Sequence, residues 1–362
     1  MRSRLFGKPG VTTVLILVLA LWLVIEEKGE NGPSLNFCPS EVTGIEEAQP
    51  FSPPLRPITP ENITEIVELS QISHTELFAW APDSRTLAVS DGQDIRLVDI
   101  SDFDEVEIFQ RPTSDFAELV YSPNGVKIAA ANTDGLIEVY DPTSGMETMF
   151  IALLRHYDWY HPIAISTNGN LIAGTMSVDS NPPYQLDVRV WDLSTQEVRH
   201  TIPVSRLNPP VTSIDFSPND RYLAFSTWGD ADSSGPPHVI IWDLVLKQRI
   251  FDFKGPDTFV FGPDGTTMAI GSRLINCKGN TLKEFDSGIV SAFSPDGRLV
   301  VTTESNRANA ITAWDAATGD PLLMLEGYPD FITNVSFSPD MQFLAFASDN
   351  TLHIWGVSPK SP

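Results

Sequence analysis

A short turn motif recurs seven times after residue 61, and this repetition restricts the fold more than any other feature of the chain. Proline presets φ at the second position of a tight turn, a short polar side chain suits the third position, and glycine suits the fourth. The copies are Ala81-Pro82-Asp83, Ser122-Pro123-Asn124, Ser166-Thr167-Asn168, Ser217-Pro218-Asn219, Gly262-Pro263-Asp264, Ser294-Pro295-Asp296 and Ser338-Pro339-Asp340. Each copy predicts a turn between two strands.

Large apolar residues hold the same positions around every turn. Two residues before the proline position stand Trp80, Tyr121, Ile165, Phe216, Phe261, Phe293 and Phe337. Five residues after it stand Leu87, Ile128, Ile172, Leu223, Met268, Val300 and Leu344, and alanine follows at once in six of the seven copies. This fixed register is typical of β-hairpins that bury one face. The 29 prolines and 23 glycines of the chain agree with many short strands and turns.

The spacing of the turns gives the size of the repeating unit. Successive turns lie 32 to 51 residues apart, about 43 on average, which is enough for four short strands. A third strand ends in an aromatic residue followed by Asp in several units, as in Trp191-Asp192, Trp242-Asp243 and Trp314-Asp315. With these motifs, residues 62–357 resemble the WD-repeat family. The resemblance implies an all-β fold, a seven-bladed β-propeller.

The two ends of the repeat region are expected to close the ring. The last repeat stops after its third strand, near Trp355, and a strand-like stretch at residues 63–69 precedes the first repeat. The resemblance implies that this stretch supplies the missing fourth strand, which removes the exposed sheet edges of an open ring. The fifth repeat departs from the family pattern, since it is short, lacks a Trp-Asp pair and has residues 277–280 as its turn.

A hydrophobic segment of a different kind lies at the N-terminus. Residues 11–25 (VTTVLILVLALWLVI) follow three basic residues, which predicts a hydrophobic helix that acts as an export signal within residues 1–30. The segment is either a cleaved signal peptide or an uncleaved membrane anchor, and the lack of small residues after it favours the anchor. In both cases the rest of the chain is expected outside the cytoplasm.

Composition and charge predict the remaining segments of the chain and argue against one class of partner. Residues 31–60 are rich in proline and are expected to form a disordered linker, because such a stretch buries too little apolar surface to fold. The propeller is expected over residues 61–358, followed by a tail at 359–362. The net charge of −24 argues against nucleic acid as a partner, because affinity for phosphates comes mainly from Lys and Arg. Two cysteines, Cys38 and Cys277, make neither a disulfide framework nor a metal cluster.

Long connections between strands indicate where a partner binds. Insertions join the second and third strands of two neighbouring repeats, at residues 177–187 and 228–238, and the family places the segment 155–161 on the same face. Insertions on one face of a repeat fold often mark its binding face, and Tyr, Trp and Arg are common interface anchors. The candidate partner-binding residues are Arg155, His156, Tyr157, Trp159, Tyr160, Asp179, Tyr184, Trp228, Asp230 and Asp232. The alternative is that these loops are neutral decoration.

Two further sets of side chains are candidates for ligand binding. Four tryptophans, Trp191, Trp242, Trp314 and Trp355, hold one structural position and are therefore expected to pack between blades. Four aspartates of the insertions have a spacing that matches no known calcium loop, so no metal or other cofactor is expected, although calcium remains an alternative. These aspartates are Asp179, Asp187, Asp230 and Asp232.

The sequence contains no catalytic signature. It has no Gly-x-Ser-x-Gly motif, no His-Glu-x-x-His motif, no phosphate-binding loop and no Cys/His cluster. On the analogy of the family, it predicts a non-enzymatic binding module or scaffold for a protein partner, working as a monomeric propeller. The alternative is a calcium-dependent, lactonase-like hydrolase with an acidic central channel. Its channel would draw on Glu76, Glu118, Asp215 and Asn334 of the innermost strands.

Overall fold

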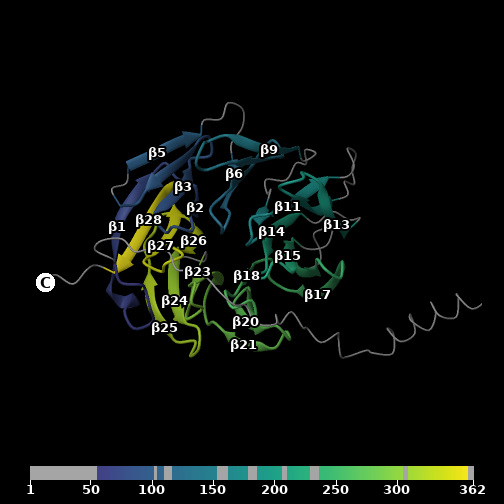
Figure 1. The fold of residues 1–362 in the computed structure, drawn as a ribbon. Helices are drawn as coiled ribbons and strands as arrows, with labels where there is room; N and C mark the ends of the chain where they lie inside the picture. Colours follow the sequence, from purple (N-terminus) through teal and green to yellow (C-terminus); the bar gives the residue numbers. More distant parts are fainter. Residues whose placement is uncertain are drawn as a thin grey trace, which may run out of the picture.

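The chain folds into a ring of seven four-stranded antiparallel sheets around a central axis (Figure 1). The computed structural model describes residues 55–101, 104–109, 116–152, 162–177, 186–205, 210–228, 236–304 and 309–357. Within these residues the regular structure consists of β-strands and one 3₁₀-helix, η1 (Ile63–Glu65). The all-β, seven-bladed propeller predicted from the repeats is confirmed.

Each of the first three blades takes four consecutive strands. Blade 1 contains β2 (Leu77–Trp80), β3 (Thr86–Ser90), β4 (Ile95–Asp99) and β5 (Asp104–Phe109). Blade 2 contains β6 (Phe116–Tyr121), β7 (Ile128–Asn132), β8 (Leu136–Tyr140) and β9 (Glu147–Ala152). Blade 3 contains β10 (Ile163–Ile165), β11 (Leu171–Ser177), β12 (Leu186–Asp192) and β13 (Val198–Ser205).

The remaining blades repeat this order until the last one. Blade 4 contains β14 (Val211–Phe216), β15 (Tyr222–Thr227), β16 (His238–Asp243) and β17 (Gln248–Lys254). Blade 5 contains β18 (Phe259–Phe261), β19 (Thr267–Ile270), β20 (Arg273–Asn276) and β21 (Thr281–Glu284). Blade 6 contains β22 (Ile289–Phe293), β23 (Leu299–Glu304), β24 (Ala310–Asp315) and β25 (Pro321–Leu325). Blade 7 combines β26 (Thr333–Phe337), β27 (Phe343–Ser348) and β28 (Thr351–Val357) with β1 (Ile66–Ser73) from the other end of the described chain.

The repeated turn motif joins the first and second strand of every blade. In blade 2, for example, the backbone N–H of Gly125 donates to the carbonyl oxygen of Ser122 at 2.8 Å, as the motif predicts. The fourth turn residue has a positive φ in all seven turns, where glycine is favoured. These residues are Ser84, Gly125, Gly169, Asp220, Gly265, Gly297 and Met341.

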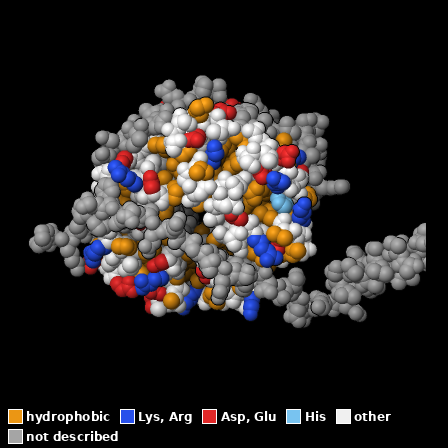
Figure 2. All heavy atoms as spheres, viewed as in Figure 1, with side chains coloured by type: hydrophobic (Ala, Val, Ile, Leu, Met, Phe, Trp, Pro, Cys, Tyr) orange, Lys and Arg blue, Asp and Glu red, His pale blue; other side chains and the backbone are white. Residues whose placement is uncertain are grey.

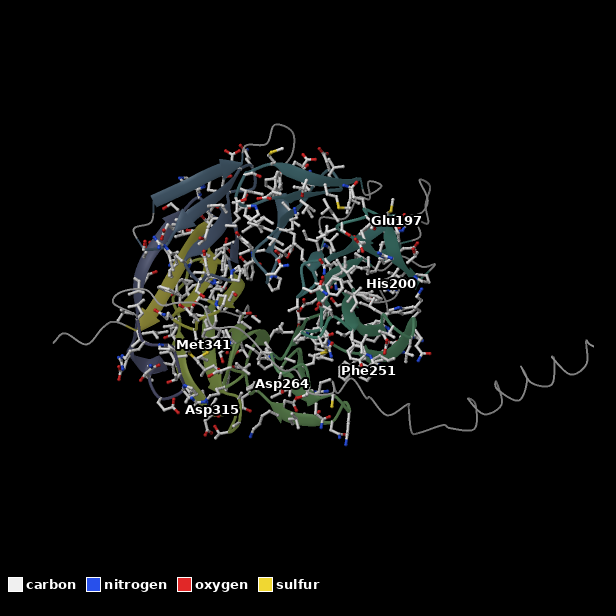
Figure 3. All side chains as sticks on the ribbon, in the orientation of Figure 1. Glu197, His200, Phe251, Asp264, Asp315 and Met341 are labelled. Carbon is white, nitrogen blue, oxygen red and sulfur yellow. The ribbon has the colours of Figure 1, made fainter. Side chains whose placement is uncertain are left out.

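The ring has two distinct ends, because every blade is an antiparallel meander. We call the end that carries these turns, together with those between third and fourth strands, the turn face. We call the opposite end the loop face; it carries the connections from blade to blade and from second to third strand. Figure 3 labels two turns of the first kind, at Asp264 and Met341, which lie nearer the middle of the ring than Glu197 and Asp315 of the outer turns.

The core lies between adjacent blades. The alanines that follow the apolar residue of each second strand, such as Ala129, Ala224 and Ala345, are fully buried and allow neighbouring sheets to approach closely. The four tryptophans at the third strands belong to these inter-blade clusters, so the prediction that they serve packing is confirmed. On the face that Figure 2 shows, hydrophobic side chains reach the surface around the middle of the ring, whereas most Lys and Arg lie further out.

Strand β1 closes the ring by pairing antiparallel with β28, from Ile66 opposite Val357 to Ser73 opposite Thr351. The predicted closure is confirmed, but the predicted bounds of 63–69 are wrong. The chain turns through η1 before it enters the strand. The side chain of Asn62 accepts a hydrogen bond from the backbone N–H of Thr59 at 2.8 Å in the turn just ahead of η1. The strand then continues four residues beyond the predicted end.

Residues ahead of β1 also pack onto the last blade. The side chains of Ile58 and Ile63 are fully buried in the cluster between blades 6 and 7, and the backbone N–H of Ile58 donates to Met341 at 2.7 Å. Arg56 forms an isolated bridge with Val357. Residues 55–60, which the sequence assigned to the linker, are thus part of the folded unit.

The hydrophobic segment 11–25 and the other features predicted for residues 1–54 lie outside the described residues. Among the residues described, no helix has the length and apolar character needed to cross a membrane. Cys277, buried at the start of the turn between β20 and β21, is disulfide-bonded. The sequence contains one other cysteine, Cys38, which lies outside the described residues.

Two carboxyl groups on the innermost strands have raised pKa values. Burial raises the pKa of Glu118, on β6, to about 7. Burial also raises the pKa of Asp215, on β14, to about 7, and the backbone N–H of Phe216 offsets only part of this effect. Loss of hydration disfavours the charged form of both groups.

We predict that Ile66→Ala lowers the free energy of unfolding by about 2–4 kcal/mol, because it opens a cavity where the closing strand meets the core. The neighbouring residue Val67 points outward and is exposed, so Val67→Ala is expected to change the stability by less than about 0.5 kcal/mol. Urea unfolding of both variants checks this. Equal losses would show that β1 does not anchor blade 7 through its buried face.

We also predict that Asp215→Asn changes the pH dependence of stability. The unfolded chain loses the Asp215 proton near pH 3.8, whereas the folded protein keeps it until about pH 7. The folded state therefore binds more protons between these values, and its stability falls as the pH rises through them. Asp215→Asn should leave stability at pH 3 unchanged and raise it at pH 7.5, by about 1.4 kcal/mol for each pKa unit removed. Urea unfolding at both pH values measures this, and a gain that is equal at both would contradict it.

Candidate functional site

Most of the predicted partner-binding residues lie outside the described structure. Arg155, His156, Tyr157, Trp159 and Tyr160 fall within residues 153–161, which are not described. The same holds for Asp179, Tyr184, Asp230 and Asp232 of the two insertions. The described strand ends place both insertions at the loop face, since β11 and β15 end there and β12 and β16 begin there.

Trp228 is the predicted residue whose surroundings the structure describes. It follows β15 directly, and its side chain is 62% exposed. Its backbone N–H donates to the carbonyl oxygen of Pro210 at 3.0 Å, and the preceding residue, Thr227, pairs with Val211 at the start of β14. Trp228 is therefore fixed at its backbone beside the innermost strand of blade 4, while its indole ring remains available to a partner.

A cavity of about 430 Å³ opens at the loop face, next to this position. It lies where the chain enters the innermost strands of blades 4, 5 and 6 and approaches blade 7. Its lining consists of Thr212, Ser213, Asp257, Thr258, Phe259, Val260, Ile289, Val290, Ser291, Thr303, Glu304, Phe331 and Ile332. Four blades thus contribute to one hollow near the axis of the ring.

Apolar side chains at the edge of this cavity are unusually exposed. Phe331, in the connection to β26, is 61% exposed, and Ile289, the first residue of β22, is 40% exposed. Large apolar side chains that remain in water near a hollow are typical of surfaces that another molecule covers. Trp228 is also exposed at the loop face, although it is not part of the cavity lining.

The lining of the cavity combines apolar side chains with polar and acidic ones. Asp257 and Glu304 contribute carboxylates, while its described lining contains no Lys, Arg or His. The hydroxyl oxygen of Thr258 is buried and has no hydrogen-bond partner within the described structure. Such a hydroxyl contributes either a donor or an acceptor to a bound group. The arrangement offers binding chemistry, and its lining holds neither an imidazole nor a thiol.

The residues proposed for an acidic channel do not gather into a metal site. Glu118, Asp215 and Asn334 lie on the innermost strands β6, β14 and β26, as predicted, and Glu76 directly precedes β2. The side-chain amide of Asn334 donates to the backbone carbonyl of Glu76 at 3.3 Å. Among the described residues, no three His, Cys, Asp or Glu side chains come close enough together to hold a metal ion.

The cavity has no clear signature in the sequence. Long insertions indicated the partner-binding face, whereas the connections that line the cavity are of ordinary length. Asp257 and Glu304 are far apart in the chain and share no motif. A signal was present in the apolar residues Ile289 and Phe331, which lie just outside or at the start of strands, where polar residues are usual.

Comparison with known proteins supports the architecture. The family model described as WD domain, G-beta repeat, matches residues 319–356. The chain is 27% identical over 190 residues to the protein LST8 homolog of Drosophila melanogaster, which covers 46% of this chain and 58% of that protein. It is 24% identical over 274 residues to the guanine nucleotide-binding protein subunit beta of Oryza sativa subsp. indica, covering 66% and 67% of the two chains.

A third relative shows how partial such matches are. The chain is 28% identical over 149 residues to the protein hir1 of Schizosaccharomyces pombe, which is 41% of this chain but 14% of that protein. The chain thus spans 14% to 67% of the length of these relatives. Seven four-stranded blades, the recurring turn with its Trp-Asp strand ends, and these matches identify the chain as a member of the WD-repeat β-propeller family.

Proposed function

We propose that this protein is a non-enzymatic binding module or scaffold that holds a protein partner at its loop face. The observation that carries the proposal is the exposure of Ile289 and Phe331 on the lining of a cavity of about 430 Å³, with the exposed ring of Trp228 on the same face. Aromatic side chains around a hollow are the usual anchors of protein interfaces, because they bury a large area at little cost in conformational entropy. Protein-interaction propellers are also typical of the family.

The opposite end of the ring is less suited to a partner. On the turn face, hydrogen bonds join the turns of neighbouring blades: the carboxylate of Asp220 accepts from the backbone N–H groups of Thr167 and Asn168, at 2.6 and 3.0 Å. The side-chain amide of Asn124 donates to the carbonyl oxygen of Asn168 at 2.8 Å. Polar groups on that face are thus used to hold the ring together, whereas the loop face leaves polar and apolar groups available.

The proposal includes a location outside the cytoplasm, with residues 11–25 as anchor or signal. The disulfide of Cys277 supports this location, because disulfides form and persist in oxidising compartments. The strongly acidic composition agrees with a domain that is kept away from nucleic acid and from anionic lipid headgroups.

We predict that a photo-crosslinking amino acid at position 331 captures a protein partner in cells of the source organism. The same amino acid at Met146 is the matched control, since Met146 is 67% exposed but lies in a turn of the opposite face. Adducts are identified by mass spectrometry after irradiation. A defined adduct through position 331 and none through position 146 is expected, and the reverse pattern would place the interface on the turn face.

We further predict that the full chain taken from cells has no free thiol. Cells are treated with a small alkylating reagent at lysis, and the denatured protein is then labelled with a mass-tagged maleimide with or without prior reduction. Two labels should appear only after reduction. Cys277→Ser should give no label even after reduction, because its remaining cysteine is a free thiol and is blocked by the alkylating reagent at lysis. Fewer than two labels after reduction of the unaltered protein would reveal free thiols and would contradict the oxidising location.

A further inference from the structure

The cavity on the loop face has a consistent chemical character that points to one class of ligand. The two charged residues of its described lining, Asp257 and Glu304, are both acidic. Neither carboxylate forms an ion pair with a Lys or Arg within the described part of the chain. Elsewhere on the surface, carboxylates do have such partners, as in the pairs Arg221–Asp243 and Arg199–Asp192. Among the described residues, no ion pair therefore neutralises the negative charge of the cavity.

A third carboxyl group, that of Asp215, lies just beyond the lining of the cavity, on the same strand as Ser213. Ser213 lines the cavity, and Asp215 follows two residues later on β14, so both side chains point to the same side of the strand. Asp215 pairs with Ala224 in blade 4, and Val260 pairs with Ala269 at the equivalent position of blade 5. Asp215 therefore holds the same place in its blade as Val260, which lines the cavity. Two carboxylates thus line the cavity, and a third lies beyond its lining on β14.

An ionised carboxylate at the position of Asp215 costs free energy. Burial raises its pKa to about 7, so its ionised form is disfavoured in the free protein. A cation placed in the cavity would favour the ionised form, because opposite charges attract strongly where water is partly excluded. The unpartnered hydroxyl of Thr258, in the same lining, is available as an acceptor for an N–H donor.

The apolar part of the cavity matches the remainder of such a ligand. Phe331 and Ile289 stand at the rim, and Val260 and Phe259 lie further in. Lys and Arg side chains carry a hydrocarbon stem with a charged head, and a cation over an aromatic ring is attracted by its π-electrons. A small inorganic cation would use none of these apolar groups, and the described residues contain no three-ligand metal cluster.

We propose that the cavity is a binding site for a lysine or arginine side chain, presented by a basic segment of the partner protein. The stem lies against Phe331 and Ile289, and the charged head is held by Asp257 and Glu304, with Asp215 beyond them on β14. A basic partner also agrees with the net charge of −24, which speeds encounter with positively charged molecules. This inference rests on the proposed function, for which it names the chemistry of the partner.

The test uses N-acetyl-arginine amide as probe, with N-acetyl-citrulline amide as its uncharged match. Binding to the full chain is followed by saturation-transfer NMR titration at pH 7.5. The arginine probe is expected to bind at least about tenfold more tightly than the citrulline probe, which corresponds to about 1.4 kcal/mol. Equal binding of the two probes would overturn the proposal.

Charge-neutralising variants locate the site. Asp257→Asn, Glu304→Gln and Asp215→Asn should each weaken binding of the arginine probe several-fold. Glu197→Gln removes the same charge from an exposed turn on the opposite face and should leave binding unchanged. Asp215→Asn is informative because it should weaken binding while it raises stability at this pH, which excludes unfolding as the cause. An equal loss in Glu197→Gln would show that overall charge attracts the probe, and the cavity site would be wrong.

The two proposals fail in different ways. If position 331 crosslinks to a protein but the charge variants bind the arginine probe as well as the unaltered chain does, the loop face binds a partner and the basic-side-chain site is wrong. If the variants lose the probe but no crosslinked protein is found, the cavity takes a cationic group and the protein-binding function is wrong.

Discussion

The pairing of β1 with β28 is the contact on which the whole ring depends. Each of the first six blades is complete within a continuous stretch of chain, and only the seventh draws on both ends of the repeat region. Without β1, blade 7 would expose the unpaired edge of β28, and the cluster between blades 6 and 7 would lose Ile58, Ile63 and Ile66. Closure therefore satisfies backbone hydrogen bonds and completes the core at the same place.

The two faces of the ring divide structural and binding roles. On the turn face, short motifs are joined to their neighbours through groups such as Asp220 and Asn124, and positive φ angles fix each turn. On the loop face, connections vary in length, and the exposed apolar side chains and the cavity lie among them. Because the strands between the faces are rigid and buried, the loop face can change its side chains without altering the packing of the blades.

The sequence predicted the fold well because the determining signals are local. A proline turn, an apolar residue on each side and a following alanine lie within about ten residues, and their repetition gives the number of blades. The closing strand was found by the same logic, but its start was misplaced, since residues 63–65 form η1 and the chain ahead of them is held by a contact between Ile58 and the distant Met341. The cavity could not be found in this way. Asp257 and Glu304 belong to different blades and line one cavity only because the blades pack side by side. No spacing along the chain predicts this.

The assembly of blade 7 has a consequence for how the protein is made. Strand β1 is synthesised first among the strands, and β28 last, so the earliest strand has no partner until almost the entire chain exists. Contacts between such distant segments form slowly, because a long loop must close before they stabilise anything. A chain that stops short of Thr351 cannot complete the ring and keeps open sheet edges that invite aggregation. The pairing of β1 with β28 thus acts as a check that synthesis has passed β28, because only then can β1 be covered.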